Sequence, residues 1–236
     1  MGGSRKWITV VECTCADNSM LPPLVIYKGK GLYRGLFTEA GDMNAKFAQS
    51  DKGYVTDKLA IEWLHAFDIA AKERSQGQPR FLLMYGHRTH YSLNMIRYVV
   101  ENNIIMMAYP RHSTHLLQPV DVCLFSPLQY AYSKAVAEYL KKTRTGVTRA
   151  LFWRVFAQAR REVYTVPNIK ASWRKAGIIP YNPDNVLSQL PAITATATTT
   201  PNPPINPKAL AALKTPRSRH ELRQHTLDAT TLILRS

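Results

Sequence analysis

Two polar segments of the sequence hold the residues best suited to chemistry, and each follows a short, uniformly apolar run. The first segment is residues 85–90, which read Tyr-Gly-His-Arg-Thr-His, and the second is residues 112–121, which end in Asp121. The apolar runs before them, residues 81–85 and 104–109, have the character of strands buried on both faces. Ligands and catalytic groups gather beyond the carboxyl ends of parallel strands, so we expect both segments at one edge of a sheet.

The histidines of these segments suggest a metal site as one hypothesis. Each segment contains an HxxH spacing, and together they supply four imidazoles, the number that closes a tetrahedral zinc site. The alternative is that these side chains order their loops by hydrogen bonding to backbone carbonyls. The sequence favours the second interpretation, because it contains no extended histidine motif with helical spacing. The four residues are His87, His90, His112 and His115.

The elements that position these segments can be read from the periodicity of apolar residues. Residues 81–85, a helix-patterned stretch at 93–100 and residues 104–109 form a strand–helix–strand series with short joints, which predicts a parallel crossover. Upstream, residues 7–15 are rich in β-branched side chains, and a turn-forming cluster separates them from an apolar run at 24–27. This pair predicts an antiparallel hairpin. The sequence therefore predicts an α/β protein whose mixed sheet is flanked by helices.

The remaining segments are helical or irregular. Helical spacing predicts a helix over residues 59–72, whereas residues 28–53 show no clean period and are expected to form an irregular connection without an assigned function. In the C-terminal half, residues 128–139 and 151–163 keep apolar side chains three and four apart, which predicts two amphipathic helices. Pro167 is typical of the first turn of a third, short helix.

Composition separates a folded domain from a tail. We expect one domain over residues 5–187, because the sequence there carries core-forming patterns. Residues 188–236 begin with an uncharged Ala-, Thr- and Pro-rich stretch and end in a basic segment, so they are predicted to be a disordered low-complexity linker and tail. The three cysteines make no disulfide framework, which fits a reducing compartment. No apolar run reaches the roughly 18 residues of a membrane span, so no membrane association is predicted.

Charge points to a polyanionic partner. Lys and Arg number 31 against 16 Asp and Glu, which gives a formal net charge of +15 among 236 residues. Nucleic acid is the commonest polyanion in a cell, and phosphate contacts of this kind are independent of base sequence. The alternative is an ordinary solvated helix face. The residues predicted to bind DNA cluster in and between the two long C-terminal helices: Lys141, Lys142, Arg144, Arg149, Arg154, Arg160 and Arg161.

Four blocks of the sequence resemble one family. The string HSTHLLQPVDVCLFSPLQYAYSK, which contains Asp121, is similar to the third-carboxylate block of the DDE superfamily endonuclease domain of pogo/Tigger-type (mariner–pogo) transposases. The other blocks are WITVVECTCADNSMLPPLVIYKGKG, FLLMYGHRTH and VPNIKASWRKAGIIPYNPDNVL, and all four follow the family's order across residues 5–187. The resemblance implies an RNase H-like fold and descent from a nuclear enzyme that cuts and joins DNA with Mg²⁺ or Mn²⁺.

The sequence departs from the family at the catalytic positions. The family uses three carboxylates to hold two metal ions, because hard cations need charged oxygen ligands. Asp121 matches the third carboxylate, whereas Tyr85 stands where the second is expected. A phenol has an unperturbed pKa of about 10 and stays neutral at pH 7. The family's first carboxylate lies on a strand before the one expected at residues 7–15, and the sequence contains no counterpart of that first strand.

These departures define three hypotheses. The first is a transposase-derived nuclear domain that binds DNA weakly and without sequence specificity, that holds metal at Asp121 weakly or not at all, and that has lost cleavage. The second is an active metal-dependent endonuclease, if upstream sequence supplies the first Asp and another ligand replaces Tyr85. The third is a domesticated scaffold that binds chromatin or other proteins. The family resemblance leaves a homodimer open, and the sequence specifies no target DNA.

Overall fold

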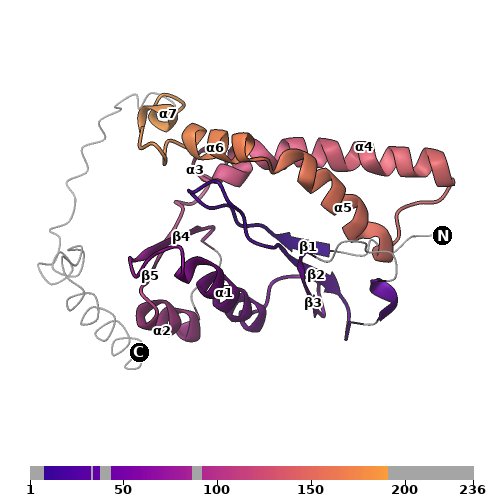
Figure 1. Cartoon of the computed structure of the whole chain (residues 1–236), viewed down its shortest axis with the longest axis horizontal. Coiled ribbons are helices and arrows are strands. Elements are labelled where there is room, and N and C mark those ends of the chain that lie inside the picture. The colour runs from indigo at the N-terminus through magenta and orange to yellow at the C-terminus, as the bar shows by residue number, and fades with distance from the viewer. Residues whose placement is uncertain (1–7, 33, 38–43, 87–91, 191–236) are drawn as a thin grey trace, which may run out of the picture. The chain divides into compact units, whose positions relative to one another are not determined.

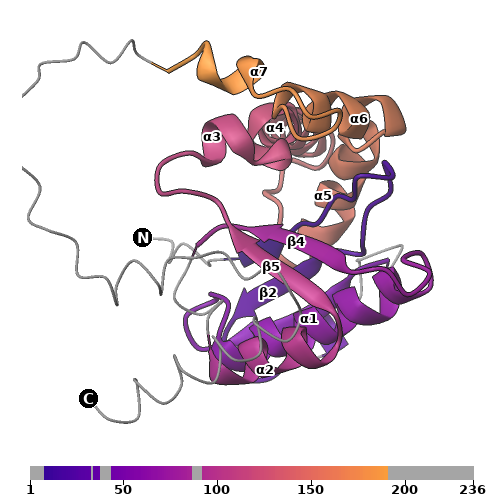
Figure 2. The same cartoon turned by 90° about the vertical axis from the view of Figure 1, so that its left-hand side faces the viewer.

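The computed structural model describes residues 8–32, 34–37, 44–86 and 92–190 (Figure 1). Strands lie between two groups of helices, with α4 (Phe125–Thr143), α5 (Arg149–Val163) and α6 (Val166–Lys175) on one side (Figure 2). Helices α1 (Asp57–Lys72) and α2 (Leu93–Glu101) lie on the other side. This mixed α/β arrangement is compatible with an RNase H-like fold, as predicted, and its C-terminal part is helical. The predicted tail lies outside the described residues apart from its first three positions.

The N-terminal strands form a three-stranded sheet. Strand β1 (Ile8–Val11) pairs antiparallel with β2 (Leu24–Lys28), so the predicted hairpin is confirmed. Strand β3 (Lys46–Ser50) runs parallel to β2 on its other side, so the prediction of an irregular connection is wrong for these residues. The sequence of β3 is polar at three of its five positions, so it lacks the apolar pattern of a strand. Its pairing with β2 defines it as a strand. Between β2 and β3 the chain forms a short 3-10 turn, η1 (Arg34–Leu36).

Strands β4 (Arg80–Met84) and β5 (Ile104–Ala108) pair in parallel through the crossover helix α2, which confirms the predicted strand–helix–strand unit. The expectation that both strands are buried on both faces is wrong. Phe81 is 64% exposed, and Ile105 and Met107 of β5 are also exposed. Helices α1 and α2 cover only one face of this pair, and the apolar side chains on the other face remain accessible.

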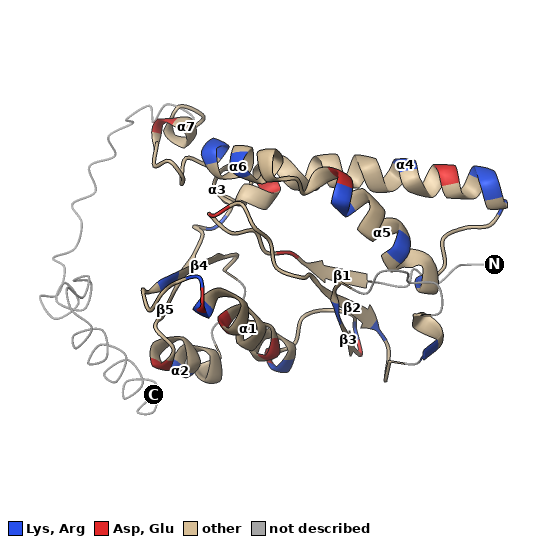
Figure 3. Cartoon of the chain, in the orientation of Figure 1, with Lys and Arg blue, Asp and Glu red and all other residues tan. Residues whose placement is uncertain are grey.

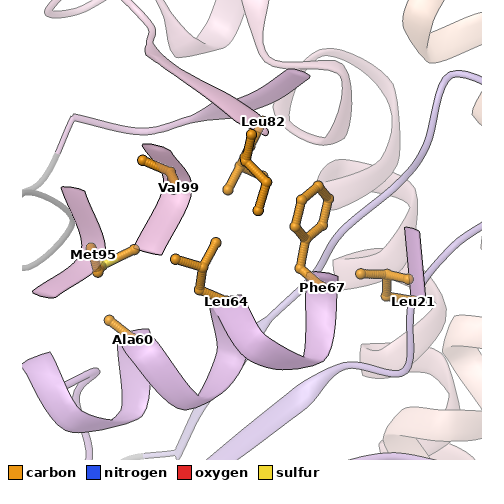
Figure 4. Packing of buried hydrophobic residues seen from close by; sticks show 8 residues of the cluster. Leu21, Ala60, Leu64, Phe67, Leu82, Met95 and Val99 are labelled. Atoms are coloured by element: carbon orange, nitrogen blue, oxygen red, sulfur yellow. The ribbon is translucent and has the colours of Figure 1, made fainter. Parts of the chain in front are cut away.

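The core beneath β4 and β5 comes mainly from α1 and α2. Leu64 of α1 and Met95 of α2 are fully buried and pack against Leu82 of β4. Figure 4 shows these side chains converging from the two helices and the strand. Thr56 and Ser92 cap the two helices, because their hydroxyl oxygens accept hydrogen bonds from backbone N–H groups of the first turn.

A buried polar network ties the same elements together. Asp68 of α1 accepts hydrogen bonds from the Arg80 guanidinium of β4 and, at 2.9 Å, from the Tyr98 hydroxyl of α2. Burial raises the pKa of the Asp68 carboxyl, but the hydrogen bonds from Arg80 and Tyr98 outweigh that effect and leave the pKa below its ordinary value. The network therefore fixes α1 against strand β4 and helix α2 of the crossover.

The two sheets are separate. Within the described ranges, no strand pairs with the outer edge of β1 or with the edge of β4 that faces away from β5. A cavity of about 380 Å³ lies here, and its lining includes Val10 and Val11 of β1 and residues 82–84 of β4.

The C-terminal helices form their own core and also cover the first sheet. Short elements α3 (Thr114–Leu117) and η3 (Val120–Leu124), a single π-helical turn, lead into α4, and α7 (Asp184–Leu187) follows α6. Leu124, Leu128, Val163 and Ile169 are buried where η3, α4, α5 and α6 meet. Trp153 and Ala157 of α5 pack against Val25 and Tyr27 of β2, so the C-terminal part is anchored to the N-terminal sheet.

Candidate functional site

The two segments singled out from the sequence begin side by side. Tyr85 follows β4 directly and Tyr109 follows β5, and the Tyr109 N–H donates to the Met84 carbonyl at 3.0 Å. Both tyrosines line the cavity between the sheets, and Tyr85 is 53% exposed. The chain therefore places Tyr85 at the carboxyl edge of the β4–β5 pair, where the sequence predicts the site.

Asp121 is brought back to the same edge by the second segment. It is the second residue of η3, it is half-buried, and its Oδ1 accepts a hydrogen bond from Gln118 Nε2 at 3.1 Å. The Asp121 N–H donates to the Gln118 carbonyl at 3.0 Å. Gln118 and its neighbours Pro119 and Val120 line the cavity that Tyr85 also lines. Single π-helical turns recur at functional sites. The charge of Asp121 on this turn reaches Tyr109, the residue after β5.

The electrostatics at this edge agree with a nearby carboxylate. Burial raises the pKa of the Tyr109 hydroxyl, and the negative charge of Asp121 raises it further. The pKa of Tyr164, the residue after α5, is raised by burial and by the charge of Glu12. Both phenols therefore remain neutral at physiological pH, and neither supplies an anionic oxygen.

Glu12 is a buried carboxylate at this site that sequence reasoning missed. It follows β1, lines the same cavity, and its side chain is only 2% exposed. Arg160 of α5 donates to it in a bidentate arrangement, with Nε 2.9 Å from Oε1 and Nη2 3.0 Å from Oε2, and also donates to the Leu21 carbonyl at 3.1 Å. Burial nevertheless raises the pKa of Glu12 above its ordinary value, because desolvation exceeds the effect of Arg160.

The oxygen donors at this edge do not fit a two-metal centre. Both Glu12 oxygens are occupied by Arg160, Tyr85 offers a phenol in place of a carboxylate, and Asp121 is the carboxylate that remains. Across the described ranges, no three His, Cys, Asp or Glu side chains are grouped so as to hold a metal ion. His87 and His90 lie outside the described residues, so the four-histidine zinc hypothesis stays a prediction.

The basic residues predicted to bind DNA divide into two groups. Arg160 is buried against Glu12, so its inclusion in a surface was wrong. Arg149 is half-buried, stacks over the Tyr27 ring at 5.3 Å and donates to the Lys28 carbonyl at 2.8 Å, so part of its guanidinium is engaged within the fold. Figure 3 shows Lys and Arg positions in blue on α4 and α5. The predicted members that are exposed lie at the end of α4 and along α5: Lys141, Lys142, Arg144, Arg154 and Arg161.

Helix α6 carries further exposed cations that were not predicted. Lys170 and Arg174 lie four residues apart, which places them on one side of the helix, and Lys175 follows. The i, i+4 spacing in the sequence is the feature that could have revealed them. Among the described helices, none is both long enough and apolar enough to span a membrane.

The fold and the site define the class of protein, and a family comparison identifies it. A mixed α/β domain with polar segments at the carboxyl edge of two parallel strands has the architecture expected of RNase H-like nucleases. Residues 4–174 match the family described as DDE superfamily endonuclease. The chain belongs to this family, whose members are generally metal-dependent.

Curated relatives agree with this assignment. A human protein named "Pogo transposable element with ZNF domain" is 28% identical over 126 residues, and a mouse "Pogo transposable element with KRAB domain" is 28% identical over 131 residues. These alignments cover 52% and 54% of this chain but 8% and 20% of the relatives. A Cochliobolus lunatus protein named "MFS-type transporter clz9" is 33% identical over 216 residues, which are 92% of this chain and 23% of that protein.

The chain thus spans less than a quarter of the length of each of these relatives. No solved structure matches the chain significantly.

The Glu12–Arg160 pair gives the first prediction. We expect Glu12→Ala to destabilise the fold by about 3–5 kcal/mol, because it leaves the Arg160 guanidinium buried without its counter-charge. Replacing both partners, as Glu12→Leu with Arg160→Met, removes the desolvation cost together with the attraction and should restore most of the loss. Urea unfolding followed by tryptophan fluorescence measures both variants.

Arg154→Ala is the matched control, because Arg154 is an exposed arginine of the same helix. Its substitution should change the free energy of unfolding by less than about 0.5 kcal/mol. Equal destabilisation by the double variant and Glu12→Ala would contradict this account of the pair.

Proposed function

We propose that this chain is a transposase-derived DDE domain that binds DNA through its helical surface and does not cleave it. The proposal joins a family assignment to a changed site. Binding is expected to be weak and independent of base sequence, since it uses phosphate contacts alone. The proposal includes a nuclear location, because chromosomal DNA lies there.

The observation that carries the loss of cleavage is Tyr85 at the edge of β4. Two-metal hydrolysis needs several anionic oxygens to hold two cations about 4 Å apart and to offset their charge. Asp121 acts on the phenols of Tyr109 and Tyr164, whose pKa values are raised so that neither is an anionic ligand. In the adjoining cavity, Tyr85 offers a phenol in place of a carboxylate, and the negative charge of Glu12 is already balanced by Arg160. A single uncompensated carboxylate supports neither the water-activating ion nor the ion that stabilises the leaving oxygen.

DNA binding rests on a different part of the molecule. Lys141, Lys142 and Arg144 are exposed at the C-terminal end of α4, and Arg154 and Arg161 are exposed on α5. The last two are seven residues apart, which is two turns or about 10 Å along the helix, so they lie on one side. Basic residues at a helix C-terminus also favour the helix dipole, which is the competing role for Lys141 and Lys142.

Cleavage is tested with supercoiled plasmid and Mn²⁺, the ion that tolerates imperfect ligand geometry better than Mg²⁺. We expect the unmodified chain and Asp121→Ala to leave the plasmid equally intact, because the site lacks the charge to hold two ions. Agarose gels resolve nicked from supercoiled DNA. Nicking by the unmodified chain that Asp121→Ala abolishes would overturn the proposal and identify an active nuclease.

Binding is tested by fluorescence anisotropy with a labelled duplex over a range of salt concentrations. Each phosphate-contacting cation adds about 0.9 to the slope of log affinity against log salt. If all three residues contact phosphate, the triple variant Lys141→Ala, Lys142→Ala, Arg144→Ala should lower the slope by about 2.7.

A control variant with the same loss of charge separates a local surface from net charge. Lys52, Lys58 and Arg97 are exposed residues outside α4 and α5, and replacing all three with Ala should leave the slope nearly unchanged. Equal effects of the two triple variants would show that overall charge, and no surface at α4, controls binding.

A further inference from the structure

Two cysteines lie together in the connection between β1 and β2. Cys13 and Cys15 are two residues apart in an extended segment, so their side chains project to the same side. Backbone hydrogen bonds close this connection, from Leu21 N–H to the Cys13 carbonyl at 3.0 Å and from Cys15 N–H to the Ser19 carbonyl at 2.8 Å. Each thiol shifts the pKa of the other, and both residues are only partly covered.

A cation stands beside this pair. Arg74, just beyond the end of α1, places Nη2 3.8 Å from the Cys15 sulfur, and its Nη1 donates to Asp17 Oδ2 at 3.0 Å. Ser19 accepts from the same Nη1 and donates to Asp17, which fixes the position of the guanidinium. The charged and titratable groups around the thiols are therefore Arg74, Asp17, Glu12 and the thiols themselves.

We propose that Cys15 is a thiol-modification site that forms mixed disulfides with small-molecule disulfides, with the Cys13 thiol as hydrogen-bond donor to its sulfur. In this reaction the Cys15 thiolate attacks one sulfur of the reagent. The reagent's S–S bond breaks as the new S–S bond forms, and the other half leaves as a thiolate that takes a proton from water. A reducing thiol reverses the exchange.

The local charges favour this assignment of roles. The hydrogen bond from Cys13 is the largest contribution that lowers the pKa of Cys15, to about 6, and Ser19 and Arg74 lower it further against the opposing effects of burial and Asp17. The same hydrogen bond and burial raise the pKa of Cys13 well above its ordinary value. Cys15 is therefore the thiolate at neutral pH, and Cys13 remains the protonated donor.

The expected gain in rate depends on pH, because a thiolate of low pKa is also a weaker nucleophile. At pH 6 a thiol of pKa about 6 is roughly half ionised, whereas an ordinary thiol of pKa 9.0 is about 0.1% ionised. This difference in ionisation is about 500-fold. With a Brønsted coefficient of about 0.45, a pKa lower by three units reduces the nucleophilicity of the thiolate by a factor of roughly 20. The net advantage is about 20-fold at pH 6 and falls to about fourfold at pH 7.

The test uses the full chain and oxidised glutathione, with peptide mass spectrometry to follow each of the three cysteines between pH 5 and 9. We expect the rate at Cys15 to rise with a midpoint near the pKa of about 6 and to exceed, at pH 6, its own rate in the urea-unfolded chain. Cys123, half-buried in η3, serves as an internal reference in the same sample. A Cys15 midpoint between 8 and 9 would overturn the proposal.

Variants separate the proposed roles from simple accessibility. Cys13→Ser keeps a donor beside Cys15 and should preserve the low midpoint, whereas Cys13→Ala should move it upward. Arg74→Ala should raise it as well, and Arg97→Ala, which removes an exposed arginine of α2, should not. Because the comparison between Ser and Ala at position 13 tests hydrogen donation, equal midpoints for these two variants would overturn the role given to Cys13.

Discussion

The Glu12–Arg160 ion pair connects the two halves of this domain, and the state of the candidate site depends on it. Its partners are 148 residues apart in sequence, one after β1 and the other on α5. Because the pair is buried and bidentate, it holds the C-terminal helices against the hairpin. The packing of Trp153 and Ala157 of α5 against β2 has the same effect. The same pairing balances the charge of a carboxylate that lines the cavity between the sheets. Glu12 thus contributes to the structure through its pairing with Arg160.

In the proposed function, the candidate site lacks the charges that the chemistry of its family requires. Tyr85 follows β4 and lines the cavity at a position where the family resemblance implies a carboxylate, and the charge of Asp121 acts on Tyr109, the residue after β5. In the proposed function, DNA contact depends on exposed cations of α4 and α5, which need no metal and no precise geometry, so it does not require catalysis. One relative is named as a transporter, and the region aligned with this chain makes up 23% of that protein.

Local pattern predicted the elements well, because helix and strand periodicity survive in apolar residues. It predicted the hairpin, the crossover and the two long C-terminal helices, whereas β3 is defined by its pairing with β2 and has no distinctive pattern of its own. Which of two neighbouring arginines is buried was harder to predict. Arg160 and Arg161 differ by about 100° around α5, so one faces the core and the other faces solvent, and composition alone does not say which. Glu12 did leave a signal, since a lone acid in the β-branched run of residues 7–15 needs a cation when it is buried.

The central claim is that Asp121 lacks the partners to hold a catalytic cation, and Mn²⁺ binding tests it most directly. Electron paramagnetic resonance of free Mn²⁺, titrated with the unmodified chain and with Asp121→Asn, reports the affinity without requiring any reaction. The account predicts that the two proteins bind alike and that any common binding is weaker than about 1 mM. Tight stoichiometric binding by the unmodified chain, lost in Asp121→Asn, would contradict it and would show that ligands beyond Tyr85 and Glu12 complete the site.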